Sequence, residues 1–268
     1  MHPRDILNSY GISPKRSLGQ NFIFDDNILS RIVNLADLKV NDSILEIGPG
    51  IGSLTRHLAT KSRSVVAVEI DDRLVPILED QLRTYDNILV LRDDILDVDL
   101  ATLFEDPYFV VANVPYYITG AILRHLFNSD PIPVRMVLTV QLEVAQRMTA
   151  QPGRMSLLAA IAQYYAQIEM GFMIKAGSFW PKPDVDSAVV KLTSYPERLV
   201  EKNQEEEFFR LLRIGFGQKR KQLQKNLRSL GFSREHILNS FQNAGIDATR
   251  RAETLSIKEW QMLYYALF

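Results

Sequence analysis

The feature that most constrains the fold is a repeated alternation of short apolar runs with helical patterns. Residues 43–47 form an apolar run that stops at a glycine-rich turn, 48–52, after which apolar residues fall at helical spacing. A β-branched run at 65–70 precedes a second helical pattern. Three more strands are predicted at 88–91, 109–112 and 136–140, and two more helices at 121–127 and 144–148. This alternation predicts an α/β fold with a doubly wound, mostly parallel sheet.

Two further strands are predicted at 168–174 and 187–192, and the segment between them holds Pro181 and Pro183 in a loop instead of a helix. A loop connection favours an antiparallel last pair, which gives a Rossmann-like sheet of seven strands. Beyond residue 197 the pattern is wholly helical. We therefore expect two domains, residues 1–197 and 198–268, the second small and all-helical.

The composition excludes several classes of protein. Hydrophobic residues make up 46% and charged residues 24%, which is typical of a globular chain. The absence of cysteine excludes disulfides and a thiolate nucleophile. Because the four histidines are also scattered along the chain, we expect no metal site. No apolar run approaches the roughly 18 residues that a membrane-spanning helix needs, and the charged N-terminal segment does not resemble a signal peptide. We expect a cytoplasmic protein that does not bind membranes.

Charge is unevenly distributed along the chain. Residues 198–268 carry 13 Lys and Arg against 8 Asp and Glu, whereas the preceding residues carry 18 against 24. A basic segment of this kind is expected to face a polyanion such as RNA. The candidate RNA-binding residues in it are Lys219, Arg220, Lys221, Lys225 and Arg228. The spacing of the last three predicts one stripe on a helix, because positions i, i+4 and i+7 share a face.

The glycine-rich turn predicts a cofactor site at the carboxyl edge of the sheet. Gly48, Gly50 and Gly52 allow the backbone to approach a ligand closely. Ser53 stands where a dinucleotide-binding motif has its last glycine, and the carboxylate of Glu46 would repel a pyrophosphate. A sulfonium and an ammonium are compatible with that carboxylate. We therefore expect S-adenosyl-L-methionine as the cofactor in preference to NAD.

Acidic residues follow the next two predicted strands. Glu69 lies 21 residues after Gly48, at the spacing where a carboxylate accepts hydrogen bonds from ribose hydroxyls. Asp94 follows the third strand and is predicted near the adenine amino group, with Ile95 covering the ring. The neighbouring Asp93 is an alternative to Asp94.

The tetrapeptide Asn113-Val114-Pro115-Tyr116 predicts the chemistry. An adenine amine is a poor nucleophile, so its methylation needs acceptors that hold both N–H groups and leave the nitrogen lone pair facing the methyl donor. The Asn113 side-chain oxygen and the Val114 or Pro115 carbonyl are suited to this, and Tyr116 can stack on a flipped base. Positioning and electrostatics then supply the rate.

A second aromatic segment, Phe179-Trp180-Pro181-Lys182-Pro183, lies in the loop between the last two predicted strands. An aromatic ring held between prolines is expected to form the second wall of a base sandwich, and we assign this role to Phe179. Lys182 is expected to contact a phosphate.

These residues together resemble the ribosomal RNA adenine N6-dimethyltransferase family, in particular its bacterial small-subunit members. The motifs that carry the resemblance span nearly the whole chain and lie at 18–22, 46–50, 113–116, 179–187, 216–221 and 251–253. The resemblance implies that Asn21 and Ile23 border the cofactor, with Gly48, Glu69, Asp94 and Asn113 completing its site. It implies dimethylation of two adjacent adenosines near the 3′ end of 16S rRNA, by a monomer acting on a pre-30S particle during ribosome biogenesis.

Two other functions remain open. A large-subunit rRNA dimethylase of the macrolide-resistance type shares the Asn-x-Pro-Tyr and cofactor motifs, although Gly19 and the basic motif 218–221 favour the small-subunit reaction. A non-catalytic nucleic-acid-binding factor on the same fold is the other alternative. The intact Asn113, Tyr116 and Glu69 argue against it.

Overall fold

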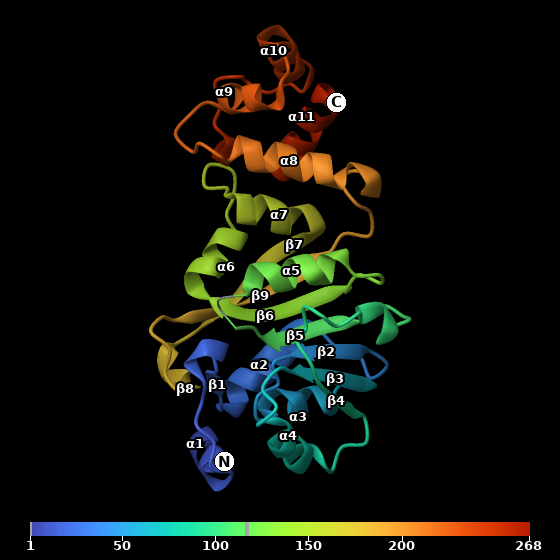
Figure 1. Ribbon diagram of the computed structural model, residues 1–268, viewed down its shortest axis with the longest axis vertical. Coiled ribbons are helices and arrows are strands. Elements are labelled where there is room, and N and C mark those ends of the chain that lie inside the picture. The colour runs from blue at the N-terminus through green and yellow to red at the C-terminus, as the bar shows by residue number, and fades with distance from the viewer. Residues whose placement is uncertain (1, 116–117) are drawn as a thin grey trace. The chain divides into compact units, whose positions relative to one another are not determined.

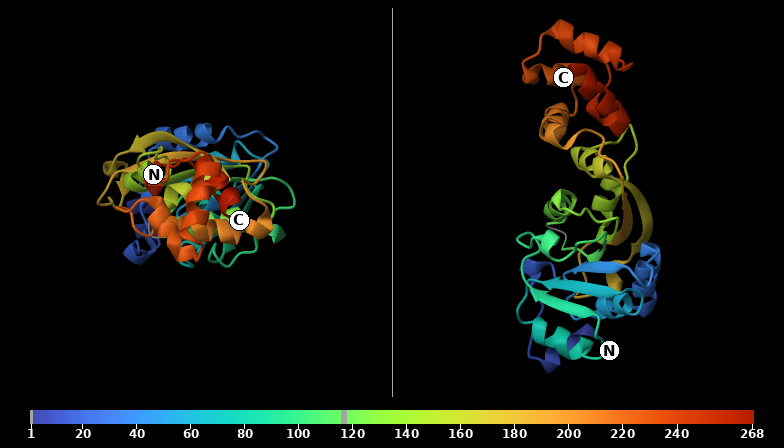
Figure 2. Two further views of the ribbon diagram at one scale, coloured as in Figure 1. Left: turned by 90° about the horizontal axis from the view of Figure 1, so that it is seen from above. Right: turned by 90° about the vertical axis from the view of Figure 1, so that its right-hand side faces the viewer.

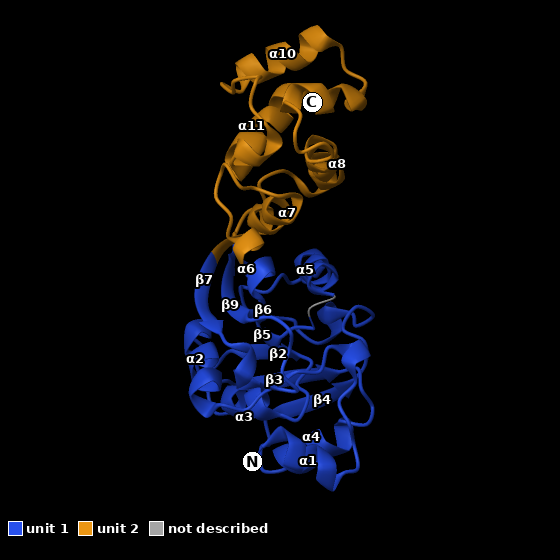
Figure 3. Cartoon of the chain, turned by 90° about the vertical axis from the view of Figure 1, so that its left-hand side faces the viewer, with its two compact units in different colours: residues 1–145, 169–194 blue, residues 146–168, 195–268 orange. Residues whose placement is uncertain are grey.

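The computed structural model of the protein describes residues 2–115 and 118–268. It divides into two compact units, one of residues up to 145 with 169–194, the other of residues 146–168 with 195–268 (Figure 3). The strands are β1 (Phe22–Ile23), β2 (Ser43–Ile47), β3 (Ser64–Glu69), β4 (Ile88–Arg92), β5 (Phe109–Asn113), β6 (Arg135–Gln141), β7 (Ala166–Ile174), β8 (Phe179–Trp180) and β9 (Ser187–Ser194). The helices are α1 (Pro3–Ser9), α2 (Asp26–Ala36), α3 (Ser53–Ala59), α4 (Val75–Leu82), α5 (Thr119–Asn128), α6 (Leu142–Met148), α7 (Leu157–Tyr165), α8 (Glu205–Gly215), α9 (Leu223–Asn226), α10 (Arg234–Asn243) and α11 (Ile257–Leu267).

The central feature of the fold is one sheet of seven strands in the described part of the chain, in the order β4-β3-β2-β5-β6-β9-β7 (Figure 1). The neighbours from β4 to β6 pair in parallel, whereas β9 is antiparallel to β6, with Leu138 opposite Val190. The predicted seven-stranded, mostly parallel sheet with antiparallel strands at its end is therefore confirmed.

The strand order fixes where a ligand can bind. The chain proceeds outward from β2 to β3 and β4, and then returns to place β5 on the other side of β2. Strand order thus reverses between β2 and β5, and open α/β sheets bind ligands at such a switch point. The glycine-rich turn follows β2 and Asn113 ends β5, so both predicted motifs lie at this point.

Helix α2 covers the sheet because its sequence has a single apolar face. Leu29, Ile32, Val33 and Ala36 recur at helical spacing and are all buried. The Asp25 carboxylate accepts a hydrogen bond from the Asn27 N–H at 2.9 Å and so caps the helix. The buried face packs with α3 and with residues of β2, β5, β6 and β9 in one core cluster.

A second, two-stranded sheet lies outside the main one. Strand β1 pairs with β8 in antiparallel register, Phe22 opposite Trp180 and Ile23 opposite Phe179. The sequence pattern predicts a loop at 179–180, and this prediction is wrong for these two residues. A strand of two residues has no alternation to detect, and its partner lies more than 150 residues away in the chain.

The second unit is helical apart from the start of β7. Helix α8 buries Phe208, Leu211 and Leu212, and α11 buries Trp260 and Leu263. The C-terminus ends among these helices (Figure 2).

Gly215 ends α8 directly against the indole of Trp260. A Cβ at residue 215 would lie 2.3 Å from the Trp260 ring, so the position needs glycine.

The basic motif after α8 is a turn and not a helix. Helix α8 ends at Gly215 and α9 begins only at Leu223, so Lys221 lies outside both. The buried Asn226 side chain donates hydrogen bonds to the Gly215 and Gln218 carbonyls at 2.7 and 3.2 Å. These bonds satisfy carbonyls at the end of α8 and hold the turn, because the last carbonyls of a helix lack partners within it. The predicted helical stripe is therefore wrong.

Among the residues described, no helix is both long and apolar enough to cross a membrane.

Candidate functional site

The glycine-rich turn brings the backbone to the carboxyl edge of β2. Gly48 and Gly50 have φ values of 66° and 64°, in the left-handed region that favours glycine. A Cβ on Gly50 would lie 2.8 Å from the ring of Phe22, which covers the turn. The turn therefore tolerates no side chain at residue 50, and its backbone is held close to the space beside β3 and β5.

Glu69 lies where β3 ends and is 4% exposed. Its two carboxylate oxygens accept hydrogen bonds from the N–H groups of Gly50 at 3.0 Å and Asp71 at 2.9 Å. Burial raises the pKa of Glu69, and these N–H donors act against the shift. The carboxylate lines a cavity of about 60 Å³ together with Asn21, Gly48 and Asn113. Each oxygen retains a lone pair for a further donor, which is compatible with the predicted role of Glu69 toward ribose hydroxyls.

A second, apolar cavity of about 110 Å³ adjoins this one at the ends of β3 and β4. Its walls include Ile70 and Ile95, and both Asp93 and Asp94 line it. Asp94 accepts a hydrogen bond from the Leu96 N–H at 3.0 Å, and Asp93 accepts one from the Asp94 N–H at 2.8 Å. An apolar slot with carboxylates at its rim suits a nucleobase that carries an amino group. Both Asp93 and Asp94 remain candidates for that contact.

Asn113 is held in one orientation. Its Nδ2 donates a hydrogen bond to the Asn21 carbonyl at 2.9 Å. No donor among the described residues bonds to Oδ1, which therefore remains available as an acceptor. The Pro115 carbonyl accepts from the Ile118 N–H at 3.3 Å, whereas no donor among the described residues bonds to the Val114 carbonyl. Of the two carbonyls predicted to hold an amine, Val114 is therefore the better suited, and Tyr116 lies outside the described residues.

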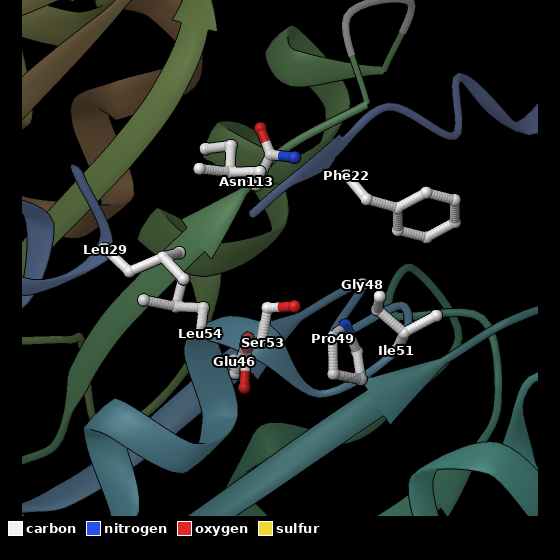
Figure 4. Close-up of a pocket in the computed structure, with 10 residues that line it drawn as sticks. Phe22, Leu29, Glu46, Gly48, Pro49, Ile51, Ser53, Leu54 and Asn113 are labelled. Carbon is white, nitrogen blue, oxygen red and sulfur yellow. The ribbon is translucent and has the colours of Figure 1, made fainter. Parts of the chain in front are cut away.

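A third, small cavity of about 30 Å³ contains the buried carboxylate of Glu46, which the sequence analysis used to choose between cofactors. Figure 4 shows Asn113 and Phe22 on one side of it and Pro49, Ser53 and Glu46 on the other. Glu46 is 1% exposed, and its Oε2 has no hydrogen-bond partner among the described residues. Burial raises the pKa of Glu46 to about 8. The cavity thus offers a latent negative charge beside the glycine-rich turn.

The two site residues near the N-terminus line cavities at this edge of the sheet, and their contact with a cofactor stays a prediction. Asn21 borders the cavity of Glu69, and Ile23 lines the cavity of Glu46.

Phe179, by contrast, is 3% exposed and packs in the core cluster with Ile23. Its ring is therefore largely covered, and its contact with a base stays a prediction.

Lys182 lines a larger outer cleft of about 550 Å³, whose other lining residues include Arg16, Asn21 and Gln141. Asn21 also lines the inner cavity of Glu69, so the outer cleft opens next to the cofactor cavities. Arg16 and Lys182 are both exposed.

In the second unit, the basic cluster consists of Lys219, Arg220, Lys221, Lys225 and Arg228. All five side chains are exposed, and none forms an ion pair within the described ranges 2–115 and 118–268. Cations without carboxylate partners are available to a polyanion. No group of three or more potential metal ligands occurs among the residues that the structure describes.

Comparisons with known proteins found one matching family and several similar chains. A family model described as "Ribosomal RNA adenine dimethylase" matches residues 12–267. The chain is 42% identical over 278 residues to the Ribosomal RNA small subunit methyltransferase A of Anoxybacillus flavithermus, covering 99% of this chain and 94% of that protein. It is 40% identical over 263 residues to the protein of the same name from Dehalococcoides mccartyi, covering 97% and 90%.

Two solved structures are also similar. A dimethyladenosine transferase from Plasmodium falciparum superposes with a TM-score of 0.80 at 25% identity, covering 90% of this chain and 95% of that one. The 23S rRNA methyltransferase ErmE superposes with a TM-score of 0.77 at 29% identity, covering 92% and 99%.

Proposed function

Because the chain belongs to the ribosomal RNA adenine dimethylase family, we propose that it dimethylates the N6 amino groups of two adjacent adenosines near the 3′ end of small-subunit (16S) rRNA. The methyl donor is S-adenosylmethionine. The observation that carries the proposal is the fixed amide of Asn113, whose free Oδ1 lies at the switch point beside the cofactor cavities. The names of the relatives at 40–42% identity support small-subunit rRNA as the substrate.

The cavities fit S-adenosylmethionine in three respects. The apolar cavity with Asp93 and Asp94 at its rim suits the adenine ring and its amino group. Glu69, in the adjoining cavity that Asn113 also lines, suits the ribose hydroxyls. The unpartnered, buried oxygen of Glu46 suits a neighbouring cation, because a buried carboxylate is stabilised by an opposite charge. When bound, this cofactor supplies an activated methyl group on a positively charged sulfur.

The protein's own groups prepare the adenine amine. The Asn21 carbonyl accepts a hydrogen bond from Asn113 Nδ2 and fixes the amide, so that Oδ1 can accept a hydrogen bond from one N6–H group. The Val114 carbonyl accepts a hydrogen bond from the other N6–H group, and Pro115 has no N–H to compete for that carbonyl. With both protons held, the nitrogen lone pair is left free to attack, and alignment supplies much of the rate. No strong base is required, because the methylated nitrogen loses its proton readily.

Two alternative functions are less well supported. The chain shares its fold with ErmE, a 23S rRNA methyltransferase, at 29% identity. The relatives at 40–42% identity are small-subunit rRNA methyltransferases by name, which favours the small-subunit substrate. A non-catalytic factor would have no need of a fixed Asn113 amide beside a buried Glu69.

The same proposal assigns a role to each part of the chain. Residues 1–197 form the catalytic domain that binds S-adenosylmethionine, and residues 198–268 form a helical RNA-binding domain that presents the basic cluster. The compact second unit adds residues 146–168 to that helical domain. The protein acts in the cytoplasm as a monomer on a pre-30S particle, and it needs no metal because amide and carbonyl acceptors suffice to orient the amine.

The test is to map methylated adenosines in rRNA from cells that lack the protein. Loss of dimethylation at two adjacent adenosines of 16S rRNA is expected, with restoration by the wild-type protein and not by the Asn113→Ala variant. Loss of methylation in 23S rRNA instead would favour the large-subunit alternative. Unchanged methylation in both rRNAs would contradict the proposal.

A further inference from the structure

The segment that joins β7 to β9, residues 175–186, supplies one wall of the outer cleft, and we call it the aromatic loop. Phe179 and Trp180 form β8 within this loop. The next five residues, 181–185, all line the outer cleft of about 550 Å³, and Lys182 is one of them. The shape of the aromatic loop therefore decides where Lys182 lies and how the cleft is walled.

Asp186 ties the two ends of the aromatic loop together. Its Oδ1 accepts a hydrogen bond from the Ala176 N–H at 2.9 Å, and its Oδ2 accepts one from Lys175 Nζ at 2.8 Å. Both donors lie at the beginning of the loop, ten and eleven residues before Asp186. The hydrogen bond from Lys175 lowers the pKa of Asp186, so the carboxylate stays ionised. Hydrogen bonds to an ionised acceptor are among the stronger polar contacts in a protein.

The backbone of Asp186 also joins the loop to the main sheet. Its carbonyl accepts a hydrogen bond from the Leu142 N–H at 3.0 Å, where α6 begins. The next residue, Ser187, lies opposite Gln141 of β6, and Gln141 lines the same cleft as Lys182. Asp186 is thus a fixed point at the edge of the cleft, to which the beginning of the loop is fastened.

The middle of the loop is held separately, by β1. Phe179 lies opposite Ile23 and Trp180 opposite Phe22. Both β1 residues line the small cavity beside Asn113. Residues 181–185 lie between this attachment and Asp186, so their position depends on both.

We infer that Asp186 is a positioning residue for methyl transfer, which holds the aromatic loop in the shape that presents Lys182 to the RNA. It acts through the loop, because Val185 lines the cleft whereas the Asp186 carboxylate faces the beginning of the loop. A phosphate contact in the cleft sets the register of the RNA strand, and therefore the placement of the target adenosine. The inference rests on the proposed function, because it takes the outer cleft as the path of the RNA.

This role separates Asp186 from cofactor binding. No residue of the aromatic loop, all of which the structure describes, lines any of the three inner cavities. Loss of the Asp186 contacts should therefore slow the transfer step and leave the affinity for the cofactor unchanged.

The first test measures the turnover of unmethylated small-subunit particles at saturating S-adenosylmethionine. Asp186→Ala removes both acceptor oxygens and should lower kcat about ten- to hundred-fold, because a misplacement of about 1 Å can slow a reaction about a hundred-fold. KM for the particles should change little, since RNA affinity comes mainly from the sum of many phosphate contacts. Asp186→Asn keeps a carbonyl oxygen for the Ala176 N–H and loses only the charge that faces Lys175. Its kcat should be intermediate.

A second variant removes the same ion pair from the other side. Lys175→Met changes an exposed side chain, so it should fold even if Asp186→Ala does not. Its kcat should match that of Asp186→Asn, and the double variant should be no slower than either, because both changes break one contact. The matched control is Lys191→Met. Lys191 also lies on β9 and pairs with Glu169 at 2.6 Å, outside the loop, so its loss should leave kcat at the wild-type value.

Trp180 reports the state of the loop directly. The chain has one other tryptophan, Trp260, which is fully buried, so acrylamide should quench mainly the fluorescence of Trp180. Quenching should increase in Asp186→Ala and Lys175→Met and stay at the wild-type level in Lys191→Met. The thermal unfolding temperature, measured alongside, shows that each variant compared is folded.

The affinity for S-adenosylhomocysteine, which binds without a transferable methyl group, completes the test. It should be equal in the wild type and in all the variants. Wild-type kcat in both Asp186→Ala and Lys175→Met would overturn the inference, and so would a fall in this affinity that parallels the fall in kcat. Failure of the wild-type protein to methylate small-subunit particles would refute the proposed function instead, and the quenching would still show whether Asp186 fixes the loop.

Discussion

Replacing Glu69 by alanine should weaken S-adenosylmethionine binding by about 1 to 3 kcal/mol, or roughly 5- to 150-fold, because hydrogen bonds to a charged group contribute on that scale. The structure sets the magnitude. Glu69 is 4% exposed, so little water can replace the lost carboxylate, and its oxygens lie in the cavity next to Asn113. The assay is isothermal titration of the cofactor at a temperature well below unfolding.

The same substitution also affects the fold. It removes the acceptor of the Gly50 and Asp71 N–H groups, and a buried donor without a partner costs about 1 to 3 kcal/mol. Glu69→Gln keeps the size of the side chain and one acceptor oxygen, so it should lower the free energy of unfolding less than Glu69→Ala does. Asp72→Ala, on the exposed side of the same turn, serves as the control. Unchanged cofactor affinity in a folded Glu69→Ala protein would refute the ribose assignment.

Three further outcomes are expected. Asn113→Ala should abolish methyl transfer while RNA binding persists, because the amide acts on the reacting amine and RNA affinity comes mainly from phosphate contacts. An Asn113→Ala protein that retained half of the wild-type turnover would show that Asn113 has no catalytic role. Replacing the basic cluster by alanines should lower RNA affinity and flatten its log–log salt dependence by about 0.7 to 0.9 per lost contact, and an unchanged slope would leave the cluster a solvated surface. Because burial raises the pKa of Glu46 from 4.5 to about 8, the folded protein binds this proton more tightly than the unfolded chain. The free energy of unfolding of the cofactor-free protein should therefore fall as pH rises from about 4.5 to 8, by at most about 5 kcal/mol, and Glu46→Gln should remove most of that fall in urea titrations.

The sequence predicted the main sheet well because its strands are long enough to show a pattern. The apolar run of β2 is followed directly by glycine, and the apolar run of β5 ends at the polar residue Asn113. Since parallel strands end at one edge, these two motifs had to meet. The positions of Glu69 and the Asp93–Asp94 pair follow from the same reasoning.

The sequence analysis missed features that depend on contacts between distant parts of the chain. Lys15 and Gln20 donate hydrogen bonds to Asp71, which lies more than 50 residues away in the chain, and no local pattern signals these contacts. The pairing of β1 with β8 has the same origin. The sequence analysis predicted a helix for the turn after α8 because it considered only the spacing of the basic residues. Gly215 and Gly217 in the sequence indicate that α8 ends before this turn.

The most direct test of the central claim incubates the purified protein with S-adenosylmethionine and small-subunit particles whose 16S rRNA lacks the modification. Mass spectrometry of the rRNA should show four added methyl groups, two on each of two adjacent adenosines near the 3′ end. Asn113→Ala should add none, and large-subunit particles should remain unmodified under the same conditions. Methylation confined to 23S rRNA, or transfer by Asn113→Ala at the wild-type rate, would contradict the account.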